Sequence, residues 1–181
     1  MRYYRIKGKL AANTANGPWL MEGGQPTDYR QVKEVRFNLP DIAIGKYLIR
    51  SLEQVGDCLC HSPKLIVSRR ARDLFQEFRL QHEIREIRAR LFNIEDQELG
   101  EFIWLETMEP VRCVDRERAV YEVWSEQVIN NITTWVLDPA KVPALDLFLA
   151  DDYKFVATEN LRRECYRRQL KNLQFDFLCE A

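Results

Sequence analysis

The residues of this chain that could carry chemistry are two histidines, five cysteines and several closely spaced carboxylates. Cysteine and histidine are the usual zinc ligands, and both can also act in catalysis. Their densest group is Asp57-Cys58-Leu59-Cys60-His61, in which the spacing is C-x-C-H. Zinc sites usually combine a C-x2-C or C-x4-C pair with a second ligand pair downstream, and no second pair follows here. The segment therefore favours small buried residues beside a loop over a metal centre.

Catalysis would need a nucleophile, a base and a group that stabilises developing charge. His61 and His82 are the only histidines, and neither lies in a local catalytic motif. An enzyme would require one of them to lie in a polar pocket beside a cysteine or a carboxylate. The chain also lacks the G-x-G-x-x-G and G-x-x-x-x-G-K patterns that bind phosphates. We therefore predict no catalytic residues, no metal and no cofactor.

Composition places this chain of 181 residues among globular proteins with one sizeable core, because 46% of its residues are hydrophobic and 30% are charged. No apolar run approaches the ~18 residues of a membrane helix, and the first ten residues lack the apolar stretch of a signal peptide. An odd number of cysteines without a secretory signal favours reduced thiols. We expect a cytoplasmic protein that does not bind membranes.

The formal net charge of −1 conceals 19 arginines, which outnumber the eight lysines and gather in four clusters. A nucleic-acid-binding accessory domain would collect such clusters on one face to neutralise phosphates. Acidic residues interleave with the arginines, however, so ion pairs at the surface are the simpler explanation. A third possibility is a protein interface, where arginine and aromatic residues are enriched and lysine is depleted. The clusters lie at residues 69–72, 85–90, 112–118 and 162–168.

The apolar pattern predicts mostly strands with two or three helices. One design occurs twice: a strand, a Ser or Thr helix cap, an amphipathic helix and a second strand. The first copy spans residues 64–92 with Ser68 as the cap, and the second spans residues 153–178 with Thr158 as the cap. The identity between the copies is too low to indicate duplication. Further strands are predicted at residues 1–7, 19–21, 32–39, 102–105, 118–124 and 132–137, and a short helix at residues 142–149.

These elements predict an α+β fold with a mainly antiparallel or mixed sheet, in a single domain over residues 1–181. The chain also resembles a known family. The resemblance rests on five segments: Tyr3-Tyr4, Leu65-Ile66-Val67-Ser68, Leu145-Asp146-Leu147-Phe148, the run from Phe155 to Leu161, and Leu173-Gln174-Phe175-Asp176-Phe177.

The family is that of bacterial immunity proteins encoded beside polymorphic or contact-delivered toxins, including those of type VI secretion, and was once catalogued as a domain of unknown function. The resemblance covers most of residues 1–178. Family members often have Gly in the turn before the last strand, where this chain has Lys171-Asn172. It implies a protein without catalytic residues that binds one cognate toxin and blocks its active site or its access to substrate.

The toxin-binding surface should complement the charge of its target. A nuclease toxin is basic and would require an acidic patch, which predicts partner binding by two groups of carboxylates. Self-association stays open at this point, and nucleic acid is the disfavoured partner. The two groups are Glu95, Asp96, Glu98 and Glu101, and separately Asp146, Asp151 and Asp152.

Overall fold

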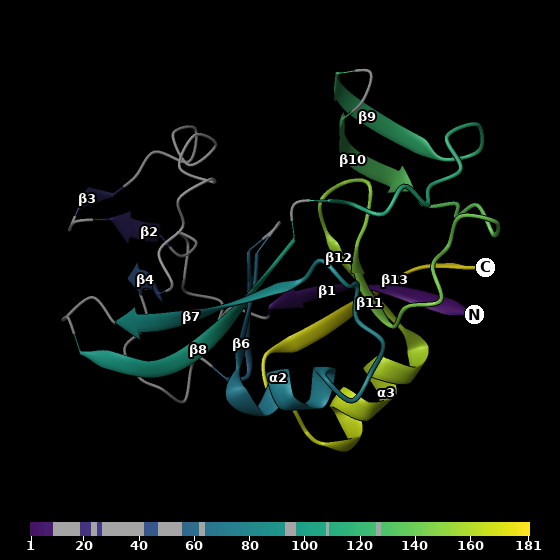
Figure 1. Cartoon of the computed structure of the whole chain (residues 1–181). Helices are drawn as coiled ribbons and strands as arrows, with labels where there is room; N and C mark the ends of the chain where they lie inside the picture. Colours follow the sequence, from purple (N-terminus) through teal and green to yellow (C-terminus); the bar gives the residue numbers. More distant parts are fainter. Residues whose placement is uncertain are drawn as a thin grey trace.

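The structure is a computed structural model that combines mostly antiparallel sheets with two helices among its described residues (Figure 1). This arrangement confirms the α+β class and the predominance of antiparallel pairing. Neither helix is long and apolar enough to cross a membrane, as far as the described part of the chain extends. The structure describes residues 1–8, 19–22, 25–26, 42–46, 56–61, 64–92, 97–107, 109–125 and 128–181.

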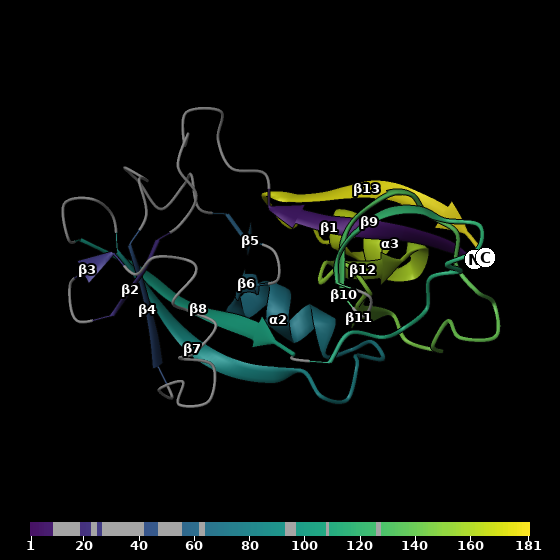
Figure 2. The same ribbon diagram turned by 90° about the horizontal axis from the view of Figure 1, so that it is seen from above.

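The first sheet contains four antiparallel strands, in the order β11 (Leu147–Leu149), β12 (Phe155–Thr158), β1 (Arg2–Gly8) and β13 (Leu173–Glu180). Helix α3 (Glu159–Arg167) follows β12 directly and buries Leu161 and Cys165. The two ends of the chain lie side by side (Figures 1 and 2), because β1 and β13 are antiparallel neighbours.

The second sheet contains seven strands, in the order β3 (Gln25–Pro26), β2 (Trp19–Glu22), β4 (Ile42–Lys46), β7 (Arg85–Phe92), β8 (Glu98–Glu106), β6 (Lys64–Ser68) and β5 (Cys58–His61). Among the strands of this sheet that the structure describes, β4 and β7 are the one parallel pair. Helix α2 (Arg69–Phe75) follows β6 and lies beside α3 (Figure 1). A separate hairpin consists of β9 (Val120–Ser125) and β10 (Val128–Thr134).

The two copies of the strand–cap–helix design belong to two units with the same topology. The first unit is β5-β6-β8-β7 with α2, and the second unit is β11-β12-β1-β13 with α3. Even the register agrees, because the residue before each helix cap pairs with the first residue of the preceding strand: Val67 with Cys58, and Ala157 with Leu147. In this comparison β13 corresponds to β7, and β1 corresponds to β8. The chain connects β7 directly to β8, whereas the end of β13 and the start of β1 lie at the two ends of the chain.

A buried aspartate precedes each unit and connects it to the other. Asp57 accepts a hydrogen bond from the hydroxyl of the α2 cap Ser68, at 2.7 Å, and one from the backbone N–H of Lys171, after α3, also at 2.7 Å. Asp146 accepts the equivalent two bonds with the roles of the units exchanged. The hydroxyl of the α3 cap Thr158 donates to it at 2.8 Å, and the N–H of Arg79, after α2, donates to it at 3.3 Å.

The backbones of these aspartates repeat the pattern. The N–H of Asp57 donates to the carbonyl of Lys171, and the N–H of Asp146 donates to the carbonyl of Arg79. Each aspartate carbonyl in turn accepts from the N–H of the cap in its own unit. The end of each helix is thus tied to the start of the other, and we call these two sets of bonds the reciprocal aspartate clamps.

One hydrophobic core serves both units. Leu65, Phe75 and Leu105 from the first unit pack in the same buried cluster as Ile6 and Phe155 from the second. Full burial of each such side chain contributes about 1.5–3 kcal/mol relative to exposure. The four-stranded sheet also contributes Tyr3, Phe148 and Val156 to a second buried cluster, in which they pack with Ile129 and Ile132 of β10.

The structure corrects three predictions of local structure. The helix predicted at residues 142–149 is wrong: Leu147–Leu149 form β11, which pairs with β12 and is buried throughout. The strand predicted at residues 132–137 begins earlier, as Val128–Thr134. The apolar pattern predicts helices that extend to about Arg79 and Leu170, but the observed helices end at Phe75 and Arg167. Thr158 occupies the cap position of α3, while its hydroxyl donates to Asp146 rather than capping the helix. The strand predicted at residues 32–39 lies outside the described residues.

Removal of either clamp carboxylate should destabilise the protein to a similar degree. Asp57→Ala and Asp146→Ala each delete two charge-assisted hydrogen bonds and leave buried donors without a partner, so we expect a loss of about 3 kcal/mol for each. Urea unfolding of both variants measures this loss. Asp73→Ala is the control, since Asp73 is exposed and pairs with Arg72 at the surface. A loss below about 0.5 kcal/mol for either clamp variant, as expected of a surface ion pair, would contradict the clamp.

Candidate functional site

The predicted acidic patches differ in where the structure places them. Glu98 and Glu101 are exposed on β8, whereas Glu95 and Asp96 lie outside the described residues. Glu98 accepts two hydrogen bonds from the guanidinium of Arg90, at 2.8 and 2.7 Å, and this contact lowers the pKa of Glu98. Glu101 pairs with the same Arg90 in the β7–β8 register. Both glutamates therefore lie beside Arg90 of β7. Their role in partner binding stays a prediction.

The second predicted patch is not an exposed surface, because Asp146, Asp151 and Asp152 are all buried. Asp146 belongs to a reciprocal clamp. Asp151 accepts hydrogen bonds from the backbone N–H groups of Cys113 and Val114, at 2.8 and 3.0 Å. The expectation of an acidic patch at these three residues was wrong, since all three carboxylates are buried against internal donors or cations.

The side chain of Asp152 is also fully buried, with none of it exposed. Its carboxylate lies 2.8 Å from the ammonium group of Lys154 and 3.6 Å from the guanidinium of Arg5 on β1. Lys154 also donates to the side-chain oxygen of Asn131 on β10. This cluster attaches the β9–β10 hairpin to the four-stranded sheet, which is a structural use of charge.

The cysteines of the described residues are buried thiols. Burial raises the pKa of Cys113 to about 12 and that of Cys179 to about 11, so both are protonated at neutral pH. Cys58 belongs to the shared core, while His82 is exposed in the turn after α2. Within the described residues, no three His, Cys, Asp or Glu side chains come together in a way that could hold a metal ion. The side chains of Cys60 and His61 lie outside that description.

Several arginines of the predicted clusters form ion pairs between elements, as the interleaved acidic residues indicated. Arg72 on α2 binds Glu86 on β7, and Arg168 after α3 binds Glu77 after α2. Most of these pairs are partly or largely exposed, so each contributes little to stability. They nevertheless occupy guanidinium groups that a nucleic-acid interface would need for phosphates.

Arg162 is used differently and forms the centre of an aromatic cluster, which we call the α3–β13 surface. Its guanidinium carbon lies 4.6 Å from the centre of the Tyr4 ring and 5.3 Å from that of the Tyr166 ring. Phe177 contacts Tyr4 edge-on at 5.7 Å between ring centres, and Phe175 contacts Tyr166 at the same separation. Phe177 is 57% exposed and Tyr166 51% exposed, so large aromatic area faces solvent.

Glu159, the first residue of α3, holds this surface in place. Its carboxylate accepts two hydrogen bonds from Arg162, at 2.9 and 3.1 Å, and a third from the Tyr4 hydroxyl. These contacts, with Arg162 the larger cause, lower the pKa of Glu159 to about 2. An irregularity in the β1–β13 register between Tyr3 and Tyr4 brings Tyr4 opposite Phe177. The arginine is therefore fixed between two rings before any partner arrives.

The α3–β13 surface was not predicted from the sequence. The arginine cluster at residues 162–168 and the closing segment Leu173–Phe177 were identified separately, and local pattern did not bring them together. The i, i+4 spacing of Arg162 and Tyr166 on one helix was the available signal. The position of Tyr4, more than 150 residues away in the chain, was not accessible from local pattern.

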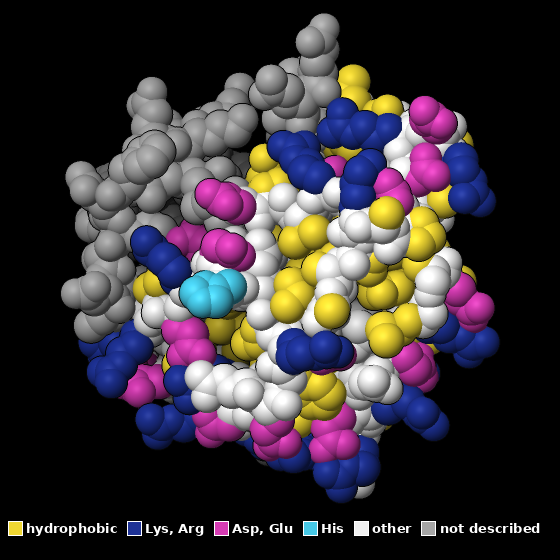
Figure 3. All heavy atoms as spheres, turned by 45° about the vertical axis from the view of Figure 1, so that its right-hand side comes forward, with side chains coloured by type: hydrophobic (Ala, Val, Ile, Leu, Met, Phe, Trp, Pro, Cys, Tyr) yellow, Lys and Arg dark blue, Asp and Glu magenta, His cyan; other side chains and the backbone are white. Residues whose placement is uncertain are grey.

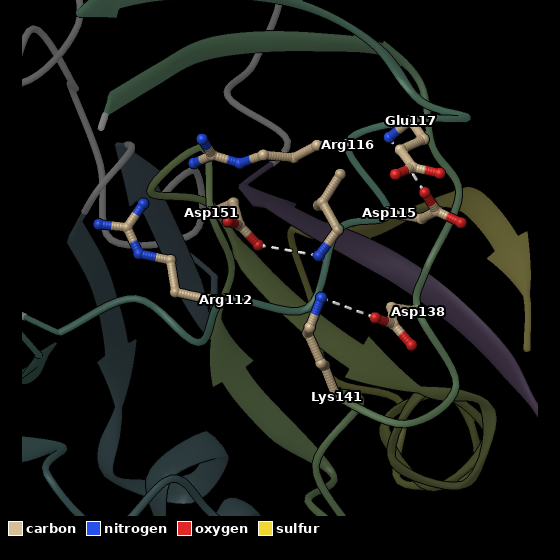
Figure 4. A pocket seen from close by; sticks show the side chains of 8 residues that line it. Arg112, Asp115, Arg116, Glu117, Asp138, Lys141 and Asp151 are labelled. Atoms are coloured by element: carbon tan, nitrogen blue, oxygen red, sulfur yellow. Dashed lines mark hydrogen bonds and ion pairs between the residues drawn. The ribbon is translucent and has the colours of Figure 1, made fainter. Parts of the chain in front are cut away.

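A polar pocket of about 710 Å³ lies beside the end of β11, at the base of the β9–β10 hairpin (Figure 4). Figure 4 shows the Lys141 ammonium group directed at Asp138, with which it forms an ion pair. The Asp151 carboxylate accepts a hydrogen bond from the backbone N–H of Val114. Acidic and basic side chains mix in its wall, so its charge favours neither an anion nor a cation. The pocket is lined by Arg112, Val114, Asp115, Arg116, Glu117, Asp138, Lys141 and Asp151.

A space-filling view of the adjoining face shows the same mixture on a larger scale. Hydrophobic side chains gather at the middle of this face, with Lys, Arg, Asp and Glu side chains around them (Figure 3). No large field of one charge covers it. This distribution is typical of a surface that recognises shape and apolar contact, with charge at the rim.

Comparison with known proteins assigns no family. No protein-family model matches the chain, and a search of curated proteins finds no match to it. The function of the α3–β13 surface is therefore argued from its own contacts.

The acid stability of the protein should depend on Glu159. A carboxylate whose pKa is lowered from 4.5 to about 2 contributes stability above pH 4.5, and this contribution disappears as the pH falls toward 2. Glu159→Gln should lower stability at pH 7 and flatten the decline between pH 4.5 and 2. Urea unfolding at several pH values measures both effects.

Glu164→Gln is the matched control, because Glu164 also has a pKa of about 2 but binds Arg167 and Arg168 instead. Both variants should flatten the acid decline, while only Glu159→Gln should change the near-ultraviolet circular dichroism of the tyrosines. An unchanged tyrosine spectrum in Glu159→Gln would contradict the placement of Tyr4 and Arg162 by Glu159.

Proposed function

We propose that this protein is an immunity protein that neutralises a co-encoded bacterial toxin by direct non-covalent binding. The observation that carries the proposal is the α3–β13 surface, in which exposed aromatic rings surround a fixed arginine. Aromatic residues and arginine are the types enriched at the energetic centres of protein interfaces. The class of partner comes from the resemblance of the chain to immunity proteins.

The geometry of this surface lowers the cost of binding. Arg162 is already held by Glu159 and stacked between Tyr4 and Tyr166, so little side-chain entropy is lost when a partner covers it. Phe177 and Tyr166 are each about half exposed, so apolar area remains to be buried. A fixed guanidinium flanked by such area can bind a carboxylate or a carbonyl of a partner while the rings exclude water.

The alternative function, a nucleic-acid-binding accessory domain, receives less support from the contacts. Its arginine clusters would have to release Glu86, Glu77 and Glu98 before they could bind phosphates. Aromatic stacking on single-stranded bases is compatible with Phe177, but the cations of the neighbouring strand β1, Arg2 and Lys7, already pair with Glu180 and Asp176.

Co-expression with the toxin domain encoded beside its gene tests the proposal. The wild-type protein should restore growth of cells that produce the toxin, and the two proteins should purify together. Tyr166→Ala removes one exposed ring of the α3–β13 surface and should raise the dissociation constant at least tenfold, which corresponds to about 1.4 kcal/mol.

Val123→Ala is the matched control, since Val123 is 52% exposed on β9, within the separate β9–β10 hairpin. It should leave the dissociation constant within twofold of the wild type. Isothermal titration calorimetry measures the dissociation constants of the wild type, Tyr166→Ala and Val123→Ala for the toxin domain. The proposal fails if no complex forms at micromolar concentration, and steep salt-dependent binding to nucleic acid would favour the alternative.

A further inference from the structure

The two units differ at one edge. In the first unit, the outer edge of β7 pairs with β4, which is added in parallel from a distant part of the chain. In the second unit, β13 takes the place of β7, and within the described residues it pairs with β1 alone. Figure 2 shows β13 at the margin of the molecule. The same sheet edge therefore carries an additional strand in the first unit and carries none among the described residues of the second unit.

The strand registers locate the equivalent position on β13. Phe102 on β8 pairs with the cap Ser68 and with Ala89 on β7. Tyr3 on β1 occupies the corresponding place, since it pairs with the cap Thr158 and with Cys179 on β13.

Ala89 and Cys179 are thus equivalent, and Ala89 is a residue to which β4 pairs, through Ala43. Because Ile42 pairs with Arg88, the residue before Ala89, an added strand would start opposite Leu178 and run along Leu178–Ala181, next to Phe177.

This edge borders the α3–β13 surface. Phe177 is 57% exposed although it lies within a strand, and its ring contacts Tyr4 rather than the core. A strand added beside β13 would project alternate side chains toward the α3 side of the sheet, where they would cover Phe177. The strand that occupies the equivalent edge, β4, has the sequence Ile-Ala-Ile-Gly-Lys, which is apolar with small residues.

A second copy of this chain fits the edge poorly. A symmetric dimer would pair β13 with itself in the antiparallel direction, whereas the strand seen on the equivalent edge is parallel. The edge therefore favours a different polypeptide.

We propose that the outer edge of β13 receives an extended, largely apolar segment of the toxin as an additional strand, so that the complex continues the four-stranded sheet. Main-chain hydrogen bonds to the edge would supply affinity, and the contact with Phe177 would supply specificity. This inference rests on the proposed function, because it names the way in which the partner is bound.

Hydrogen exchange of the protein with and without the toxin domain encoded beside its gene tests the inference. Backbone amides within Leu178–Ala181 should exchange at least tenfold more slowly in the complex. Phe177→Lys places a charge at the added strand and should weaken binding at least tenfold, whereas Val123→Lys, on the exposed β9, should change it less than twofold. Circular dichroism checks that both variants fold.

The possible outcomes separate the two proposals. If the toxin domain binds but the amides of β13 exchange as in the free protein, strand addition is overturned and the proposed function stands. If no complex forms, the proposed function fails and the inference fails with it. If the β13 amides are protected in the protein alone and more so at higher concentration, a second copy occupies the edge, which overturns the inference.

Discussion

The structure depends on the reciprocal aspartate clamps. Asp57 and Asp146 each accept a hydrogen bond from the helix-cap hydroxyl of one unit. Each also accepts a hydrogen bond from a backbone N–H that follows the helix of the other unit. Buried carboxylates require such donors, because an unpaired buried charge is costly. Each clamp therefore fixes where one helix starts and where the other ends, and the shared core closes around that arrangement.

The α3–β13 surface follows from this constraint. The clamp at Thr158 starts α3 directly at the end of β12, which places Glu159 next to the Tyr4 hydroxyl and Arg162 over the Tyr4 ring. The helix ends at Arg167, and Phe177 on the edge strand keeps more than half of its surface exposed. Apolar area exposed beside a fixed charge is the property that the proposed binding function uses, and it depends on a buried contact at the start of the helix.

Local pattern predicted the parts of this fold that depend on neighbours in sequence. The strands before Ser68 and Thr158, both helices and the last strand are confirmed, because apolar periodicity and cap residues act over a few positions. Residues 147–149 were predicted as helix because three consecutive apolar residues suit either state, and pairing with β12 decided for a strand. The acidic patch at Asp146, Asp151 and Asp152 was wrong for a related reason: a carboxylate in sequence carries no sign of burial.

The sequence by itself determined the α+β class, the repeated strand–cap–helix design and the excess of arginine over lysine. These follow from residue type and short-range spacing, which act before the chain is compact. Only the tertiary structure decided that the two copies clamp each other, that Tyr4 and Arg162 stack, and that β13 is an edge where its counterpart β7 is not. Those features join residues as far apart as 4 and 162, and such contacts are set by the packing of whole sheets against one core.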